Sequence, residues 1–390
     1  MLDTTQLTYG GLLALVFYAT YELYSHFVKW QRERKTIGGQ VPPDDKINVK
    51  IIDTDPFYIT PLPDFNWQTT EPLKFRAFKP KYHLTMGKAS PHQLAHYHSQ
   101  STAVGTSSLS ELLEFDKNYL KRITLRKQII KDHHPIAIQS DPSVIPALNE
   151  LYIFLTSTYL PTRFPTIFSL SSSLSLPTTL LNRVTNEHLP LTPPLDPTQT
   201  LEILGENIDE DFLILLPSED GDGYCLKGYV TCFPAGFNTK EKFGMKLRDI
   251  HAPVPGYKAK LEKSMDRFFD RLEVGKVVKR SNWSVNTKEQ LFAASGTHLY
   301  EGEEAVEEEV NIDTTFLRCE RQLLHRLPNT KALCFNFKTY LYPLREIKEE
   351  GLGEDLANAI DGLKAGSVPE MHFYKRGVVW GEKVKEYLRS

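Results

Sequence analysis

Cysteine is scarce in this sequence, with four residues among 390, and no two of them are spaced as a CxxC pair. A disulfide scaffold and a zinc ribbon both require closely spaced cysteines, so neither is expected. A few scattered thiols are typical of a protein that folds in a reducing compartment. The four residues are Cys225, Cys232, Cys319 and Cys334.

Several nucleotide-binding and catalytic motifs are also missing. The sequence contains no GxGxxG, GxxxxGKS/T or GxSxG segment, so glycine-rich phosphate loops and a nucleophile elbow are not expected. A flavin fingerprint and the cysteine spacings of iron–sulfur clusters are absent as well. The formal net charge is −3 and no basic stripe stands out, so no nucleic acid partner is expected.

Charge is absent near the N-terminus between Asp3 and Glu22, which leaves an uncharged run of 18 residues, Thr4–Tyr21. A helix that spans a bilayer needs about 20 mostly apolar residues. The first five residues lack the basic region and the cleavage site of a signal peptide. We therefore expect one N-terminal transmembrane helix. The alternative interpretation is a buried core helix.

Basic residues follow this uncharged run, at Lys29, Arg32, Arg34 and Lys35. By the positive-inside rule, the later part of the chain faces the cytosol. The sequence thus predicts a single-pass membrane protein with its C-terminal domain in the cytosol. We divide it into an anchor with its basic flank (residues 1–35), a linker (36–54) and a folded domain (55–385).

Apolar periodicity after the linker predicts a mixture of helices and short strands. Helical spacing is found over residues 109–131, 142–155, 257–272, 315–327 and 353–363. Short β-rich runs cover 212–216, 224–233, 277–285, 333–342 and, as a weaker signal, 375–379. Short strands interleaved with helices indicate an α+β body with an antiparallel sheet.

The loop after His251 is the first candidate site. Pro253 and Pro255 fix the backbone dihedral φ, so this part of the chain is stiff. A stiff loop beside the aromatic-rich helix that begins at Tyr257 can hold an imidazole in one orientation, which suits a metal or haem ligand. The alternative is a histidine that only hydrogen-bonds a neighbouring carbonyl group.

A second candidate is the charged segment from Arg318 to Pro328, which we expect on a helix. There, Glu320 is most simply part of a surface ion-pair network. In a pocket, however, Glu320 could bind a cationic substrate, and Arg321 or Arg326 could bind an anionic group.

Taken in order, these segments resemble the haem-dependent oxidative N-demethylase family, also known as the catalytic subunit of dimethylamine monooxygenase. The matching segments span about residues 55–345. They are Met86-Gly87, Asp116-x-x-Tyr119-Leu120, Phe164-Pro165, Glu210-Asp211-Phe-x-Ile-Leu-Leu, Phe233-Pro234-Ala-Gly-Phe, Lys242-x-Gly-x-x-Leu-x-x-Ile-His251-x-Pro-Val-Pro-Gly256-Tyr257, Arg280-x-Asn282-Trp283, and Arg318-x-Glu320-Arg321-Gln-x-Leu-x-Arg326-Leu-Pro328.

The resemblance implies a PAS-like antiparallel sheet with flanking helices that binds haem, with O₂ activated at the iron. It implies oxidation of a secondary methylamine to a primary amine and formaldehyde, with electrons that start on NADPH. The matched residues then take expected roles. His251 is the axial iron ligand and Glu320 the catalytic carboxylate on the distal side. Candidates for the haem propionates are Arg280, Arg321 and Arg326, and Tyr257 and Trp283 are expected to pack against the macrocycle.

This chain also departs from the family. The segment Ala89–Ser107 is longer than expected, Leu324 replaces a more familiar arginine, and the bacterial enzyme has no N-terminal anchor. Because flavin and iron–sulfur motifs are missing, a separate flavin or iron–sulfur reductase must supply the electrons. Two alternatives remain: a haem-PAS sensor or haem carrier without turnover, and a membrane-tethered scaffold that has lost haem. His325 and His298 are the next candidate ligands after His251.

Overall fold

The computed structural model describes residues 55–82, 84, 108–173 and 176–390. The predicted anchor (1–35) and linker (36–54) lie outside these residues. Within the described ranges, no helix is both long and apolar enough to cross a membrane.

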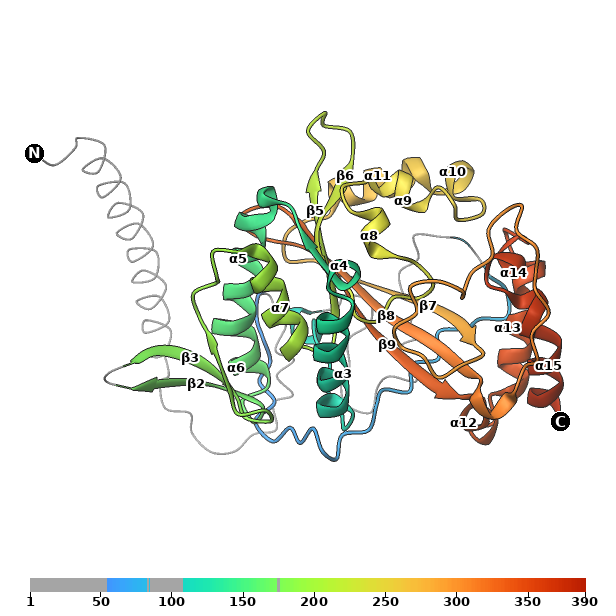
Figure 1. Ribbon diagram of the computed structural model, residues 1–390, viewed down its shortest axis with the longest axis horizontal. Coiled ribbons are helices and arrows are strands. Elements are labelled where there is room, and N and C mark those ends of the chain that lie inside the picture. Colours follow the sequence, from blue (N-terminus) through green and yellow to red (C-terminus); the bar gives the residue numbers. More distant parts are fainter. Residues whose placement is uncertain (1–54, 83, 85–107, 174–175) are drawn as a thin grey trace, which may run out of the picture. The chain divides into compact units, whose positions relative to one another are not determined.

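Six strands form one antiparallel sheet in the order β1-β6-β5-β9-β8-β7 (Figure 1). They are β1 (Ile138–Ser140), β5 (Asp211–Pro217), β6 (Tyr224–Val230), β7 (Val277–Asn286), β8 (Phe316–Arg326) and β9 (Leu333–Pro343). Apolar and aromatic side chains that suit a pleated, buried surface dominate β5, β6 and β9. The predicted strands at 212–216, 224–233, 277–285 and 333–342 are confirmed, as is the α+β class.

A second sheet contains β2 (Phe168–Ser173), β3 (Leu176–Asn182) and β4 (Glu187–Pro190). The α-helices are α3 (Tyr119–Asp132), α4 (His134–Ala137), α5 (Ile145–Ile153), α6 (Leu160–Arg163), α7 (Pro197–Asn207), α8 (Thr239–Lys242), α9 (Leu247–His251), α10 (Tyr257–Lys260), α11 (Glu262–Arg271), α12 (Leu344–Glu349), α13 (Gly353–Ala365), α14 (Met371–Tyr374) and α15 (Gly377–Arg389). A π-helix, Phe154–Tyr159, joins α5 to α6. The predicted helices at 142–155, 257–272 and 353–363 are confirmed, the second as α10 and α11. Of the predicted helix 109–131, only the part from Tyr119 on is α-helical.

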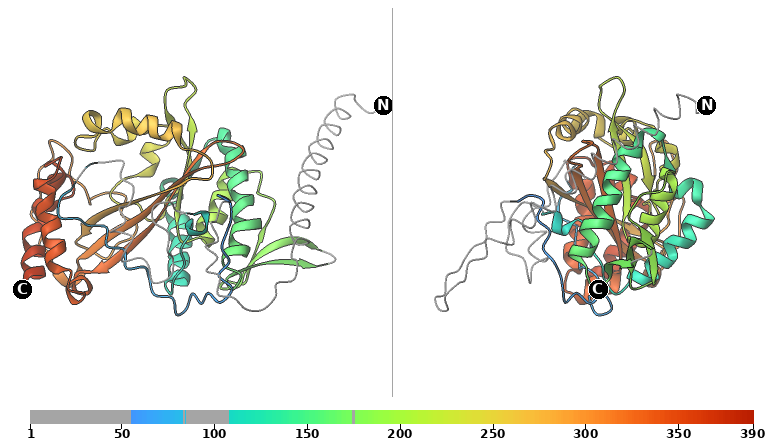
Figure 2. Two further views of the ribbon diagram at one scale, coloured as in Figure 1. Left: turned by 180° about the vertical axis from the view of Figure 1, so that it is seen from behind. Right: turned by 90° about the vertical axis from the view of Figure 1, so that its left-hand side faces the viewer.

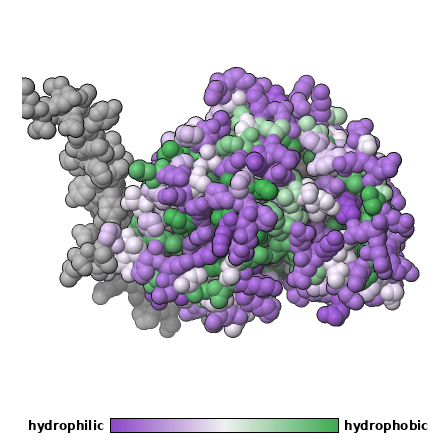
Figure 3. Space-filling model, viewed as in Figure 1, coloured by the Kyte–Doolittle hydropathy of each residue, from purple (hydrophilic) through white to green (hydrophobic). Residues whose placement is uncertain are grey.

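Alternation along the strands separates two cores. In β5, Phe212 and Ile214 pack with residues of α3, α5 and α7, whereas Leu213 and Leu215 pack with α9, α10 and α11. Helices α9–α11 lie together beside β5 and β6 in both orientations (Figures 1 and 2). On the face drawn in Figure 3 the surface is mostly hydrophilic, as expected when the apolar side chains fill these cores.

The predicted helix 315–327 is wrong, because this segment is strand β8. Its charged residues suggested a solvated helix face, but both faces of β8 are covered. Arg318 and Arg321 are each 1% exposed and Glu320 is 5% exposed. Even-numbered residues of β8 face one core and odd-numbered residues face the other. Arg318 and Glu320 therefore lie on one side of the sheet and Arg321 on the other.

The weaker strand prediction at 375–379 is also wrong. Helix α15 begins at Gly377, directly after Arg376, whose φ of 58° is left-handed. Trp380, Val384 and Leu388 recur every four residues and are buried together with residues of α13. Val378 and Val379 suggested a strand, but tertiary packing of the helical stripe decides the structure.

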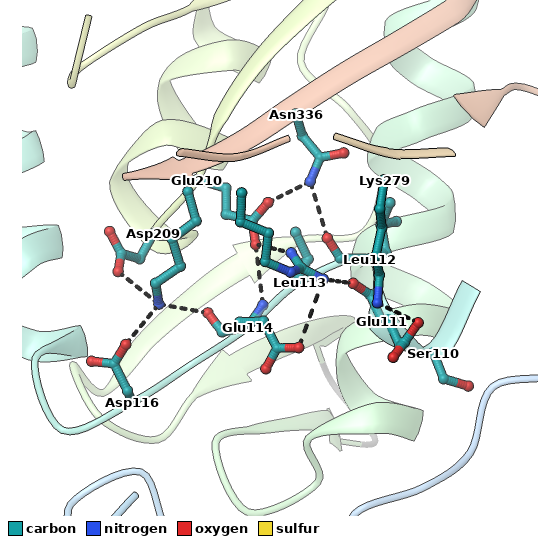
Figure 4. Close-up of polar contacts among 12 residues, drawn as sticks. Ser110, Glu111, Leu112, Leu113, Glu114, Asp116, Asp209, Glu210, Lys279 and Asn336 are labelled. Atoms are coloured by element: carbon teal, nitrogen blue, oxygen red, sulfur yellow. Dashed lines mark hydrogen bonds and ion pairs between the residues drawn. The ribbon is translucent and has the colours of Figure 1, made fainter. Parts of the chain in front are cut away.

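A buried charge network joins residues 109–118 and α3 to the sheet, and Figure 4 shows its part around residues 110–116. Asp209, Glu210 and Asp211, at the start of β5, are each only 1% exposed. Asp209 pairs with Arg122 at 2.7 Å and with Lys338 at 3.1 Å. Glu210 accepts a hydrogen bond from the Glu114 backbone N–H at 3.1 Å. Burial raises the pKa of Glu210 to about 7.

Asp211 is the member of this network that shapes the chain after β6. It pairs with Arg126 at 2.6 Å and accepts hydrogen bonds from the backbone N–H groups of Cys232 and Phe233, both at 2.8 Å. Arg126 also donates to the Gly205 carbonyl at 2.6 Å. This carboxylate therefore fixes the turn that follows β6 as well as the position of α3.

We expect Arg126→Met to lower the free energy of unfolding by about 3–5 kcal/mol, because it leaves the buried Asp211 carboxylate without its cation. Urea unfolding checks this. Lys127→Met is the matched control, since Lys127 pairs with Glu187 at the surface and its loss should cost at most about 1 kcal/mol. Equal losses of unfolding free energy in the two variants would show that the buried pair stabilises the fold no more than the surface pair does.

Candidate functional site

A cavity of roughly 390 Å³ lies against one face of the main sheet. Its walls combine strands β5, β7, β8 and β9 with α9–α11, the segment around Tyr82 and the turn after α14. Pockets of a few hundred Å³ with apolar walls and a few polar groups are typical small-molecule or cofactor sites.

Strand register places four polar side chains on the sheet side of this cavity. Arg280 is opposite Gln322, and Asn282 is opposite Glu320, in the antiparallel β7–β8 pair. Because side chains alternate along a strand, all four point to the same face. Phe335 of β9 and Leu213 and Leu215 of β5 continue this face as an apolar surface.

His251 is the last residue of α9 and lies in the wall of the cavity. Its Nδ1 atom is 2.7 Å from the Leu247 carbonyl oxygen, one turn earlier. A carbonyl can only accept, so Nδ1 carries the proton and Nε2 keeps its lone pair. Burial lowers the pKa of His251 to about 4, so the ring is neutral at pH 7. A neutral imidazole with Nδ1–H bonded to a carbonyl is the form that ligates metals.

The loop after His251 is held in one conformation. The Val254 backbone N–H donates to the His251 carbonyl at 2.9 Å, and Gly256 has a left-handed φ of 72°. A Cβ at Gly256 would lie 2.8 Å from Val368 Cγ2, so the chain approaches its neighbour closely. Tyr257 stacks on His251 with ring centroids 5.4 Å apart. The stiff loop expected from the prolines is present, and so is the carbonyl hydrogen bond offered as the alternative.

Glu320 is buried, and its two carboxylate oxygens differ in their hydrogen bonds. Oε2 accepts a hydrogen bond from Gln322 Nε2 at 2.9 Å and a longer one from Asn282 Nδ2 at 3.4 Å. Oε1 is 4.0 Å from Arg318 Nε and has no hydrogen-bond partner among the described residues. A buried carboxylate oxygen without a donor costs free energy. Because Glu320 lines the cavity, its carboxylate suits a cationic ligand.

Arg280 also lines the cavity. Burial lowers the pKa of its guanidinium, although Tyr82 and Glu320 oppose the shift. In the part of the chain that the structure describes, no carboxylate forms an ion pair with Arg280. A buried guanidinium in a cavity wall suits a bidentate carboxylate of a ligand.

Tyr257 and Trp283 contribute to the same cavity wall and are 1% and 5% exposed. Five of the seven predicted site residues are therefore brought together. The other two, Arg321 and Arg326, do not line the cavity. Arg321 lies on the opposite face of β8, 3.5 Å from Glu210 and 3.7 Å from Glu114. Period-two alternation separates it from Glu320, its neighbour in sequence.

Arg326 lies at the end of β8 and binds the C-terminal end of α11. Its guanidinium donates to the carbonyls of Leu272 at 2.7 Å and Phe269, and to the Tyr224 hydroxyl at 3.0 Å. Helix ends have unsatisfied carbonyl groups, which an arginine can satisfy. The contact holds α11, whose Met265 and Phe269 line the cavity. Arg326 thus supports the site from outside.

Two further residues line the cavity: His298, which the sequence analysis named as a next candidate ligand, and Lys375, which it missed. His298 lies in a loop, stacks near Tyr374 with centroids 4.4 Å apart, and has its pKa lowered to about 3 by burial. Lys375 is 2% exposed, and burial lowers its pKa to about 8. No local pattern marks Lys375, because its partners lie more than 90 residues earlier in the chain. The other fallback ligand, His325, is buried on β8 and does not line the cavity.

The family model described as haem-dependent oxidative N-demethylase, alpha subunit-like, matches residues 103–385. This range covers the main sheet, α9–α11 and the C-terminal helices, so it contains His251, Arg280, Glu320 and Lys375. The chain belongs to the haem-dependent oxidative N-demethylase alpha subunit-like family.

Proposed function

We propose that this protein is a haem-binding monooxygenase that demethylates a small methylated amine. The overall reaction converts a secondary methylamine, O₂, two electrons and two protons into a primary amine, formaldehyde and water. The single observation that carries the proposal is the neutral, carbonyl-anchored imidazole of His251 in the wall of a largely apolar cavity. Family membership gives this arrangement its chemical meaning.

The side chains around the cavity fit haem. His251 could offer Nε2 to an iron ion, and Arg280 could offer its guanidinium to a propionate. The apolar side chains of β5, β9 and α11, with Tyr257 and Trp283, suit the faces of a macrocycle. When bound, haem supplies the activation of O₂ that protein side chains cannot provide.

Glu320 is the proposed catalytic residue. Its carboxylate lines the cavity and can accept a hydrogen bond from the ammonium group of a protonated amine. A carboxylate so placed can take a proton from the substrate nitrogen and return it during the reaction. The two amides on Oε2 keep the carboxylate in one orientation.

Electrons in this proposal start on NADPH and reach the haem through a separate flavin or iron–sulfur reductase. We also propose that residues 1–35 anchor the chain in a membrane as a single-pass protein with the catalytic domain in the cytosol. A tether beside a membrane-bound reductase would raise the local concentration of that partner.

The proposal includes a PAS-like architecture for the sheet. Its support is the antiparallel arrangement β6-β5-β9-β8-β7, in which the first and last of the five consecutive strands are neighbours. Helices α8–α11 lie in the chain between β6 and β7, which are the second and third of these strands. Together with the sheet, these helices line the cavity.

We expect the purified wild-type protein to bind haem with a Soret band and His251→Ala to lose more than about tenfold in haem affinity, since the iron loses its ligand. Haem titration followed by absorbance measures this. His188→Ala is the control, because His188 lies exposed on β4, where it bonds Thr179. An unaltered Soret band in His251→Ala would redirect the search to His298, the other candidate ligand that lines the cavity.

Glu320→Gln keeps the size of the side chain and removes its charge and proton affinity. We expect amine-dependent O₂ consumption to fall by roughly 10²–10⁴-fold while the haem spectrum is retained. Glu303→Gln, at an exposed loop position, serves as the control. Unchanged turnover in Glu320→Gln would refute its catalytic role. A wild-type protein with a Soret band and no amine oxidation would support the haem sensor or carrier instead.

Deletion of residues 1–35 should reduce amine oxidation in cells but leave turnover with a soluble chemical reductant unchanged, because the tether affects only delivery of electrons. Replacement of these residues by an unrelated single-pass helix should restore cellular activity. If the deletion variant is fully active in cells, the tether has no part in electron transfer.

A further inference from the structure

Lys375 reaches from the C-terminal helices to the floor of the cavity. It follows α14 directly, and its Nζ atom donates to Asn282 Oδ1 at 3.0 Å and to the Trp283 carbonyl, both in β7. The ammonium group lies 5.6 Å from the ring centroids of Tyr82 and Trp283. Lys375 is 2% exposed, and its ammonium group has two hydrogen-bond acceptors and two aromatic neighbours. These contacts hold the ammonium group in one place.

The backbone of Lys375 is fixed on both sides. Its N–H donates to the Met371 carbonyl at 3.0 Å, and its own carbonyl accepts from Trp380 Nε1 at 3.0 Å. The next residue, Arg376, donates to Glu308 at 2.7 Å and to the Gly296 carbonyl at 2.9 Å. Trp380 is fully buried in the core of the C-terminal helices. The lysine is thus held firmly against β7.

This contact determines how the Asn282 amide points. An ammonium group can only donate, so the oxygen of the amide faces Lys375 and its NH₂ group faces the other way. In that orientation Asn282 Nδ2 lies 3.4 Å from Glu320 Oε2. Asn282 and Glu320 are directly opposite each other in the β7–β8 register, so a flipped amide would turn its oxygen toward the carboxylate.

Gln322 Nε2 binds the same Oε2 atom at 2.9 Å. Two amide donors on one oxygen fix the plane of the carboxylate and leave Oε1 as the oxygen without a donor among the described residues. Loss of Lys375 would release the Asn282 amide, and one of the two constraints on Glu320 would then disappear.

We propose that Lys375 is a positioning residue that acts through Asn282 to orient the Glu320 carboxylate in the cavity wall. The role of Glu320 toward a cation rests on the proposed function. The coupling of Lys375 to Glu320 does not, because it follows from the contacts of the protein alone.

The first experiment needs neither haem nor turnover. Unfolding free energies are measured for the wild type, Lys375→Met, Glu320→Gln and the double variant. We expect the loss in the double variant to be smaller than the sum of the single losses by the equivalent of about tenfold in the unfolding equilibrium, or 1.4 kcal/mol. The control cycle pairs Glu320→Gln with Lys383→Met, since Lys383 is exposed on α15 and bonds only Glu386. Additive losses in the Lys375 cycle would overturn the proposal.

Should Lys375→Met fail to fold, Asn282→Ala takes its place in the same cycle. It removes the intermediate amide and leaves the lysine, so the same coupling to Glu320 is expected. Additive losses of unfolding free energy in the cycle of Asn282→Ala and Glu320→Gln would equally refute an effect transmitted through Asn282.

The second experiment measures binding of dimethylammonium chloride to the haem-loaded full chain by calorimetry. We expect Lys375→Met to weaken binding about tenfold, Lys375→Arg to restore part of the loss, and Lys383→Met to have no effect. Loss of binding in Glu320→Gln with unaltered binding in Lys375→Met would overturn the positioning role. A wild type that binds no dimethylammonium would overturn the proposed substrate class, and the unfolding cycle would still decide the role of Lys375.

Discussion

Strand β8 bears charged side chains on both faces, and neither face reaches solvent. Arg318 and Glu320 point to one core and Arg321 to the other, and all three are nearly completely buried. A buried charge is tolerated only when other groups compensate for the water that it has lost. The surroundings of β8 are therefore constrained residue by residue, and the arrangement of the elements beside it follows from that requirement.

On the face opposite the cavity, compensation comes from carboxylates and carbonyls. Arg321 lies beside Glu114 and Glu210, and Glu210 in turn binds the segment before α3 (Figure 4). On the cavity face, Arg318 donates to the carbonyls of Phe233 at 2.7 Å and Pro234 at 3.1 Å. Asp211 binds the N–H groups of the same turn. One turn is thus held from both directions by buried charges, and it leads into Ala235 and Phe237 of the cavity wall.

Sequence reasoning succeeded where a single periodicity decides the structure. The helix from Tyr257 and strand β9 have apolar residues at a regular spacing, and β5 is a continuous apolar run. The prolines after His251 do restrict its loop. It failed at β8, because buried charges imitate the polar face of a helix when their partners are unknown. The same error grouped Glu320 with Arg321, which the strand sends to opposite faces. Lys375 was missed because its role depends on Asn282, 93 residues earlier in the chain.

The charges around the cavity are unequal, and this bears on the order of binding in the proposed function. Five cationic side chains line it, but Glu320 is the one Asp or Glu among the lining residues that the structure describes. The cations are Lys79, Lys81, Lys242, Arg280 and Lys375. Burial lowers the pKa values of Lys242, Arg280 and Lys375, because their charged forms have lost water.

An anionic ligand would compensate these buried cations, whereas an ammonium ion would bring a further positive charge. The two carboxylates of haem would therefore be favoured in the cavity before any amine is bound. Once they pair with cations such as Arg280, the remaining field at Glu320 becomes less repulsive to a methylated ammonium ion. In the proposed function, the excess of cations and the one carboxylate among the described lining residues would separate a position for an anionic cofactor from a position for a cationic substrate within the same cavity.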